Sequence, residues 1–157
     1  MAGAKDFTEL RIWMQAREWS RRIFQATKQT PFKTDQRLVR QVNDSSESVM
    51  SNVAEGFGRG TQGEFIQFIG SLDETRSHLV AAYDREYIDK RGYANLFSTG
   101  TGIRKQTVAF IVSMIKPGSG VKHMRKQRDY KNEVWEMYER LTGKQRPELF
   151  RPDEPDG

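Results

Sequence analysis

The sequence predicts an all-α fold: an antiparallel up-down-up-down four-helix bundle with an additional C-terminal helix and a disordered tail. Apolar residues recur every three or four positions in four long segments before residue 116, which is the spacing of one helix face. Short stretches rich in Gly, Pro and polar residues separate these segments. Because short turns place successive helices antiparallel and side by side, the pattern indicates a bundle.

The composition restricts the class of protein. A chain of 157 residues fits one domain and is long enough to bury a core. It contains no cysteine, which excludes disulfides, thiolate metal sites and cysteine nucleophiles. No run approaches the roughly 18–20 apolar residues of a membrane span, and the N-terminus lacks the apolar core of a secretory signal. We therefore expect a cytoplasmic protein with no membrane partner.

The first helix is expected from about Thr8 to Lys28. Glu18 and Arg22 are four residues apart, in the favourable order for an exposed ion pair. The segment ends before Pro31, because the residue preceding a proline is disfavoured in the helical region. The inward stripe consists of Leu10, Trp13, Ala16, Ser20, Ile23 and Thr27, widened by Trp19 and Phe24.

The second helix is expected to begin near Thr34, where Asp35 suits the positive end of the helix dipole. Serines beside its apolar stripe are interpreted as small residues at a close helix interface rather than as nucleophiles. The glycines within residues 56–60 are expected to end the helix in a turn. The inward stripe consists of Leu38, Val42, Ser45, Val49 and Val53.

The third helix is expected to open at Thr61, because Thr61 and Glu64 have the spacing of a capping box. Its apolar stripe continues to about Ile88, after which Asp89 is placed to cap a fourth helix. Two glycines, at positions 100 and 102, each cost roughly 1 kcal/mol of helix propensity relative to Ala. The inward positions of the fourth helix are Leu96, Gly100, Ile103, Thr107, Phe110, Ile111 and Met114.

The pattern divides the chain into four parts. Residues 1–116 form the bundle, residues 117–120 (Pro-Gly-Ser-Gly) a linker, residues 121–143 a basic helix that Gly143 can close, and residues 144–157 a disordered tail. Residues 117–146 contain eight basic and four acidic side chains, whereas the last eleven residues contain one basic and four acidic. The positive charge is therefore concentrated before an acidic, Pro-containing end.

Two neighbouring motifs carry a resemblance to a known family. Residues 51–59 read Ser-Asn-Val-Ala-Glu-Gly-Phe-Gly-Arg, and residues 64–74 read Glu-Phe-Ile-Gln-Phe-Ile-Gly-Ser-Leu-Asp-Glu. Together they resemble the pattern Asn-Ile-Ala-Glu-Gly, an Arg-bearing turn, Glu-Phe-x-x-Phe and Ser-Leu-x-Glu of the four-helix-bundle family encoded within 23S rRNA intervening sequences. The resemblance covers about residues 5–116.

The resemblance implies a bundle that assembles into a ring-like homopentamer. It also implies kinship with the accessory variability protein of diversity-generating retroelements, a basic pentameric bundle that binds a reverse transcriptase and its template RNA. Asn52, Glu55, Gly56 and Arg59 belong to the family motif. A carboxylate near the end of a helix is unfavourable toward the dipole, so we expect Glu55 to form a structural salt link with an Arg of a neighbouring helix or subunit.

No set of residues predicts catalysis, a cofactor, a metal site or a small-molecule substrate. Glu74 and His78 are four residues apart and are expected to meet on one helix face, but di-metal bundles use Glu-x-x-His on two helices. The glycine-rich residues 56–60 are not followed by the Lys-Ser/Thr of a phosphate loop. We therefore expect a protein that is not an enzyme.

Basic side chains supply the candidate function. A net charge of +5 and a pI near 9.6 are compatible with binding to nucleic-acid phosphates, although a solvated basic surface explains them as well. The leading hypothesis is an oligomeric scaffold that binds RNA or a nucleoprotein, with a reverse transcriptase as a candidate partner. The alternative is a protein-interaction module without nucleic acid, with Trp19 or Trp135 at its contacts. The proposed phosphate contacts are Arg11, Arg17, Arg21, Arg22, Lys122, Arg125, Lys126, Arg128 and Lys131.

Overall fold

The computed structural model describes residues 4–59, 62–115, 135–136, 138–140 and 142–145. All regular structure in these ranges is helical, as predicted, and they contain no strand. Two short 3-10 helices, η1 (Phe7–Glu9) and η2 (Phe32–Thr34), accompany four long helices. The long helices are α1 (Arg11–Thr27), α2 (Gln36–Arg59), α3 (Gln62–Asp84) and α4 (Lys90–Ile115). In the described ranges no helix is both long and apolar enough to cross a bilayer.

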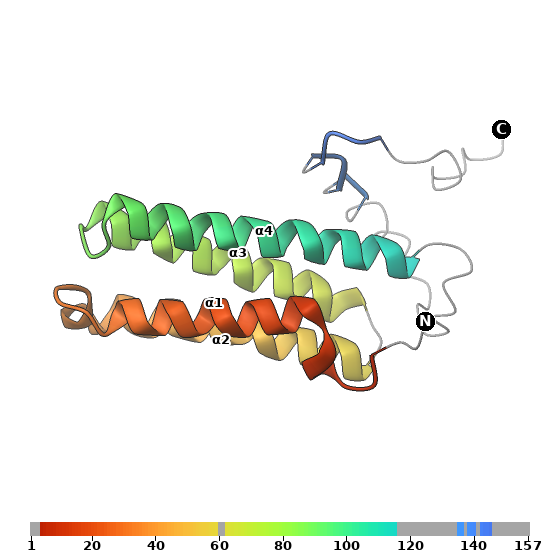
Figure 1. Cartoon of the computed structure of the whole chain (residues 1–157), viewed down its shortest axis with the longest axis horizontal. Coiled ribbons are helices and arrows are strands. Elements are labelled where there is room, and N and C mark those ends of the chain that lie inside the picture. Colours follow the sequence, from red (N-terminus) through yellow and green to blue (C-terminus); the bar gives the residue numbers. More distant parts are fainter. Residues whose placement is uncertain (1–3, 60–61, 116–134, 137, 141, 146–157) are drawn as a thin grey trace.

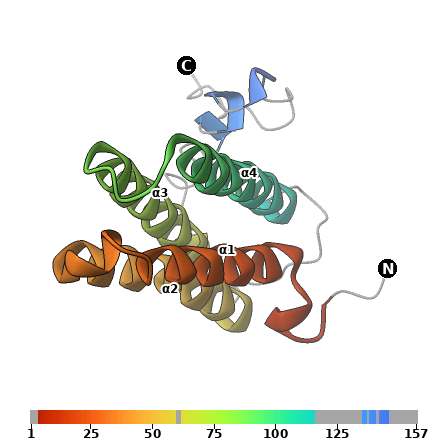
Figure 2. The ribbon, with the colours of Figure 1, turned by 60° about the vertical axis from the view of Figure 1, so that its left-hand side comes forward.

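The four long helices form the predicted antiparallel bundle (Figure 1). Each packs against two neighbours in the order α1–α2–α3–α4, and the circuit closes through α1 and α4. The α1–α2 and α3–α4 connections lie at one end of the bundle, and α2 meets α3 at the other (Figures 1 and 2). The contact between α2 and α3 is the most extensive, and that between α1 and α4 is the least. Side chains are therefore expected to pack least closely along the line where α1 meets α4, called here the α1–α4 seam.

Trp19 is the centre of the contact between α1 and α4. Its side chain is fully buried, and its indole N–H donates a hydrogen bond of 2.9 Å to the Leu96 carbonyl oxygen. The six-membered ring lies against Gly100, where an added Cβ would come within 2.6 Å of Trp19 Cζ2. A residue with a side chain at position 100 would push α4 away from α1. The glycine that weakens α4 as an isolated helix is thus required for its packing.

The inward face of α1 differs from the expected one. Trp19 lies in the middle of the buried stripe, whereas Trp13 is only half-buried and Phe24 is 47% exposed. The expectation that Trp19 contacts a partner is therefore wrong, because its whole surface is used inside the bundle. The buried residues of α1 are Ile12, Ala16, Trp19, Ile23 and Thr27.

The helix α2 continues through Gly56 and Gly58 and ends at Arg59, within the stretch 56–60 where its end was predicted. Gly56 is buried, and a Cβ at this position would lie 2.8 Å from the Phe65 ring of α3. The glycine therefore permits a close approach of two helices rather than a turn. The predicted capping residue Thr61 lies outside the described residues.

Hydroxyl groups hold α1, α2 and α3 together at their buried interface. Ser20 and Ser46 hydrogen-bond each other across α1 and α2 at 3.1 Å, and Thr75 donates to Ser45 at 2.9 Å across α3 and α2. Ser45 and Ser46 are buried, so the interpretation as small residues at a close helix interface is confirmed for these two. It is wrong for Ser51, which is exposed, and Ser48 is half-buried. Ser45, Ser46 and Thr75 also donate to carbonyl oxygens of their own helices. The buried hydroxyl groups are therefore hydrogen-bonded, as buried polar groups must be.

The helix α3 ends at Asp84, earlier than predicted, in a hydrogen-bonded C-terminal motif. Glu86 has a positive φ of 59°, the Tyr87 N–H donates to the Ala82 carbonyl at 2.8 Å, and the Glu86 N–H donates to the Tyr83 carbonyl at 2.9 Å. This is the Schellman arrangement, which satisfies the last carbonyls of a helix. The chain is thereby turned away from the α3 axis before α4 begins.

Asp35 connects the start of α2 to the segment that follows α3. Its Oδ1 accepts from the Leu38 N–H at 3.1 Å, as expected of a helix cap, and its Oδ2 accepts from Arg85 at 2.8 Å and the Tyr87 hydroxyl at 3.1 Å. The Leu38 hydrogen bond, followed by those of Tyr87 and Arg85, lowers the pKa of Asp35. Phe32 stacks on the Tyr87 ring, with centroids 5.3 Å apart. One end of the bundle is thus closed by polar and aromatic contacts.

The helix α4 begins as predicted. The Asp89 side chain accepts from the Gly92 N–H at 2.7 Å, which satisfies one of the unpaired donors of the first turn. The helix then continues without a break through both glycines to Ile115, so the weaker half identified in the sequence is held by its contacts with α1 and α3.

Little of the C-terminal region is described. The linker 117–120, the greater part of the basic helix and most of the tail lie outside the described residues. Within the region, residues 135–136, 138–140 and 142 are helical, and Gly143, with a φ of +67°, donates its N–H to the Glu139 carbonyl at 2.8 Å. Gly143 therefore closes the helix, as expected. Trp135 is only 3% exposed and packs edge-on against Tyr138, which contradicts its assignment to a partner contact.

The role of Gly100 is testable by substitution. Gly100→Ala is expected to lower the free energy of unfolding by about 1–3 kcal/mol, because the new methyl group overlaps the Trp19 ring. Denaturation by urea at a fixed protein concentration measures this change.

The matched control is Gly102→Ala in the same helix. An added Cβ at position 102 meets nothing within 4 Å, so this variant is expected to gain up to about 1 kcal/mol from helix propensity. Equal effects of the two substitutions would show that Trp19 does not restrict position 100.

Candidate nucleic-acid interface

The four arginines of α1 that were predicted to contact phosphate have different environments. Arg11, Arg17 and Arg21 are exposed, and Arg22 is partly buried. The structure therefore places three of them on the outer surface of the bundle and one toward a neighbouring helix. Their positions are compatible with phosphate contacts, but they do not form one uniform row.

Arg21 forms an ion pair within its own helix. Its Nη2 and Nε donate to the two carboxylate oxygens of Glu18 at 2.8 and 2.9 Å. These hydrogen bonds, with smaller effects of the charges on Arg22 and Arg17, lower the pKa of Glu18. The predicted pair between Glu18 and Arg22 is therefore wrong: the three-residue spacing is used, which leaves Arg22 to reach another helix.

Arg11 and Arg17 carry positive charge that no acid in the described part of the chain neutralises through an ion pair. Arg17 lies over the Trp13 ring, 5.8 Å from its centroid, and Trp13 in turn packs edge-on against Phe7. The guanidinium is thus partly ordered by an aromatic face while its hydrogen-bond donors stay available. Such groups are suited to phosphate oxygens.

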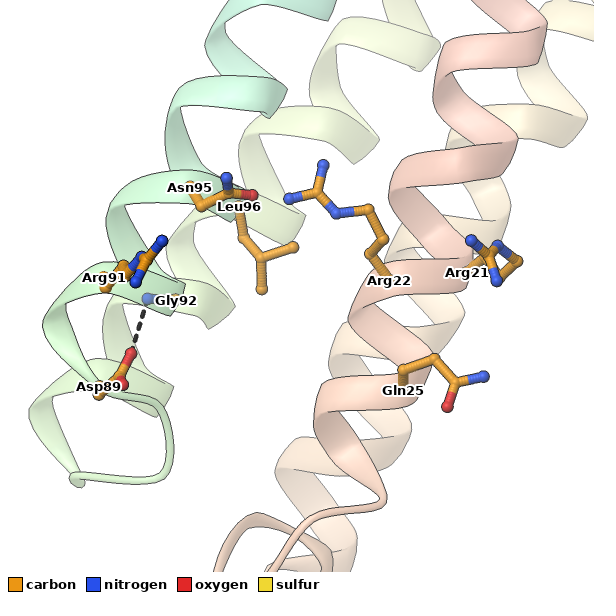
Figure 3. A pocket seen from close by; sticks show the side chains of 8 residues that line it. All are labelled: Arg21, Arg22, Gln25, Asp89, Arg91, Gly92, Asn95 and Leu96. Carbon is orange, nitrogen blue, oxygen red and sulfur yellow. Dashed lines mark hydrogen bonds between the residues drawn. The ribbon is translucent and has the colours of Figure 1, made fainter.

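A groove lies between α1 and α4, with a volume of about 430 Å³. Arg21, Arg22 and Gln25 line it from α1, and Asp89, Arg91, Gly92, Asn95 and Leu96 from α4 (Figure 3). Arg22 extends across toward α4, where it donates a long hydrogen bond of 3.4 Å to the Thr99 hydroxyl. The seam with the least helix contact is therefore also a place where guanidinium groups of two helices gather.

Sequence reasoning missed Arg91 and the groove. Arg91 is 69 residues from Arg22 in the sequence, and no local motif includes it. The signal lies in topology: in an antiparallel bundle that closes through α1 and α4, the end of α1 must lie beside the start of α4. Pairing the two segments in that register brings the two arginines to one seam.

The other predicted site residues lie in the C-terminal region and on α3. The C-terminal basic residues lie outside the described residues and stay a prediction; they are Lys122, Arg125, Lys126, Arg128 and Lys131. His78 Nε2 lies 3.5 Å from Glu74 Oε1, so the expected meeting on one helix face is confirmed. Among the described residues, no group of three His, Asp or Glu side chains is placed to hold a metal ion.

Comparison with known proteins decides the family. The model of the 23S rRNA-intervening sequence protein family matches residues 8–109. The chain belongs to this family. No curated protein and no solved structure matched. The matched range covers α1, α2, α3 and most of α4, so the resemblance read from the sequence motifs is confirmed.

The motif of this intervening-sequence protein lies where α2 meets α3. The Asn52 side-chain amide donates to the Ser71 hydroxyl at 3.1 Å, which links the two halves of the motif directly. Gly56 is buried under Phe65. Glu55 is exposed and Arg59 is the last residue of α2. The described contacts of the motif are therefore structural, and the salt link of Glu55 stays a prediction.

Substitution of the motif glutamate tests that prediction. Glu55→Gln in this intervening-sequence protein is expected to lower the melting temperature by a few °C, equivalent to roughly 1 kcal/mol for a surface link, or to disrupt assembly. Calorimetry and light scattering measure the two effects.

The control for charge removal is Glu47→Gln. This residue is also exposed and lies two turns earlier on α2. If both variants behave as the unmodified protein does, the motif glutamate has no structural link to lose.

Proposed function

We propose that this intervening-sequence protein is a non-enzymatic oligomeric scaffold that binds RNA, or a nucleoprotein partner, through basic surfaces of its bundle. The observation that carries the proposal is the state of the α1 arginines. Arg11 and Arg17 are exposed, and neither has an acidic partner among the residues that the structure describes. Guanidinium groups of this kind give sequence-independent binding to phosphates by releasing condensed counterions.

Oligomerisation increases the effect of a weak basic surface. Each copy of the chain repeats the same arginines, and once one copy has bound an RNA, the later contacts become intramolecular. Two or three phosphate contacts per copy are then sufficient for useful affinity. The proposal thus joins the assembly implied by the family resemblance to the charge seen on α1.

A second candidate function is protein interaction without nucleic acid. Its support is the exposure of large apolar side chains on the same helix: Met14 is 48% and Phe24 is 47% exposed. Both lie on the outer side of α1, where they are available to a neighbouring copy or to a partner such as a reverse transcriptase. Phe24 is also covered in part by Lys28, whose Nζ lies 4.3 Å from the ring centroid.

Binding to a structured RNA at increasing salt tests the first proposal. The logarithm of the affinity is expected to fall linearly with the logarithm of the salt concentration. The double variant Arg11→Gln, Arg17→Gln is expected to reduce the slope by about 0.7–0.9 for each phosphate contact that is lost. Fluorescence anisotropy at five or more salt concentrations measures both quantities.

The matched control removes the same charge from another face. Arg37 and Arg40 are exposed on α2, and the double variant Arg37→Gln, Arg40→Gln is expected to change the slope less. An equal change in both double variants would mean that binding is not centred on α1. A protein with no affinity at low salt would rule out RNA and leave the protein-interaction function.

Assembly is tested by mass. Light scattering after size-exclusion chromatography is expected to give about five times the chain mass of 18.2 kDa. Met14→Glu is expected to reduce this mass if the apolar side of α1 takes part in the interface, because burial of an unpaired carboxylate is costly. A monomer at micromolar concentration would contradict the scaffold proposal.

A further inference from the structure

Arg22 is a charged side chain without a charged partner. It is partly buried, and its described polar contact is the 3.4 Å hydrogen bond to the neutral Thr99 hydroxyl. Within residues 4–59 and 62–115, no carboxylate forms an ion pair with it. A guanidinium is always protonated and has five N–H donors, and removing charge from water without a counter-ion is unfavourable. An anionic ligand would supply what the chain does not.

The groove brings a second guanidinium to the same place. In Figure 3, Arg22 extends from α1 toward Asn95 and Leu96 of α4, and Arg91 lies one turn before Asn95 on α4. The two arginines therefore line the groove from its opposite walls. In the described part of the chain, Arg91 also has no ion pair.

We propose that the groove between α1 and α4 binds a phosphate group of an RNA backbone, with Arg22 and Arg91 donating hydrogen bonds to it from the two helices. This inference rests on the proposed function. It assigns RNA to a site that includes Arg91, a residue that belongs to none of the sequence motifs. Asn95 supplies a further amide at the same level of the groove.

The arrangement suits an anion that has several acceptor oxygens. A phosphate has oxygens that point in different directions, so it can accept from two guanidinium groups on opposite walls. Arg21 contributes little, because Glu18 already holds it with two hydrogen bonds.

The single acid of the groove does not block the site. Asp89 lies at the end of the groove next to the α3–α4 connection (Figure 3), and its Oδ1 is engaged by the Gly92 N–H at 2.7 Å. The Arg22 guanidinium lies further along α4, beside Asn95. The expected position of a phosphate is therefore between the level of Arg91 and that of Asn95, beyond Asp89.

The floor and the open side of the groove suit a nucleotide unit. Leu96 is 6% exposed at the floor, and its carbonyl is held by the Trp19 indole. The floor is thus part of the buried core. The groove is open to solvent, so an adjoining ribose can lie beside the phosphate, over the Leu96 side chain.

The experiment uses the full chain with two probes: inorganic phosphate and a short single-stranded RNA. Isothermal titration at constant ionic strength measures phosphate binding, and fluorescence anisotropy measures RNA binding. Arg22→Gln and Arg91→Gln are each expected to abolish phosphate binding and to weaken RNA binding threefold to tenfold. The control Arg37→Gln is expected to leave phosphate binding unchanged.

The outcomes separate this inference from the proposed function. RNA binding that neither groove variant weakens, together with no phosphate binding, overturns the groove and leaves the RNA scaffold intact. Phosphate binding that depends on both arginines, in a protein without RNA affinity, keeps the groove as a phosphate site but overturns its assignment to RNA, together with the RNA scaffold. Loss of phosphate binding in the Arg37→Gln control as well would also overturn the groove, since any arginine would then suffice.

A change of fold is separated from a loss of ligand contacts by two further measurements. Arg91 is exposed near the start of α4, so its variant is expected to keep the melting temperature and helicity of the unmodified protein. Arg22→Lys keeps the charge but loses the planar arrangement of donors, and it is expected to bind phosphate several-fold more weakly. Full phosphate affinity in Arg22→Lys would contradict recognition by two guanidinium groups.

Discussion

The packing of α4 against α1 depends on the contact of one indole ring with one glycine. Trp19 fills the space over Gly100 and binds the Leu96 carbonyl, which fixes both the separation of α1 from α4 and their register along the bundle axis. A hydrogen bond of this kind, made between buried groups, is costly to leave unmade. Since the α1–α4 contact is otherwise the least extensive, the groove, the arginines beside it and the closure of the bundle all follow from this contact.

The sequence was sufficient to predict the four helices and most of the residues that each helix buries, because apolar residues that recur every three to four positions are a strong local signal. It was insufficient where a glycine has two possible roles. Gly56 was read as a helix end and Gly100 as a weakness, although both lie against aromatic rings of a neighbouring helix. Only the partner helix shows whether a glycine permits a turn or a close approach, and the partner is distant in the sequence.

Only part of the candidate site was predicted, because the remaining contacts also depend on residues that are distant in the sequence. The arginines of α1 were visible as a cluster, but the sequence could not show that Glu18 would choose Arg21 over Arg22, since both spacings occur on one helix face. That choice separates an ion-paired arginine from one without an ion pair. Arg91 could not be predicted from any local pattern, because it lies near Arg22 only when α4 packs against α1 in the folded bundle.

The family motif and the groove lie at opposite ends of the molecule. Asn52, Gly56 and Phe65 join α2 to α3 at one end, whereas Arg91 and Asp89 lie beside the α3–α4 connection at the other (Figure 1). The 24 residues of α2 span about 36 Å between these ends. The residues that hold α2 against α3 are therefore separate from the residues that line the groove, so a substitution in the groove leaves the α2–α3 contact in place.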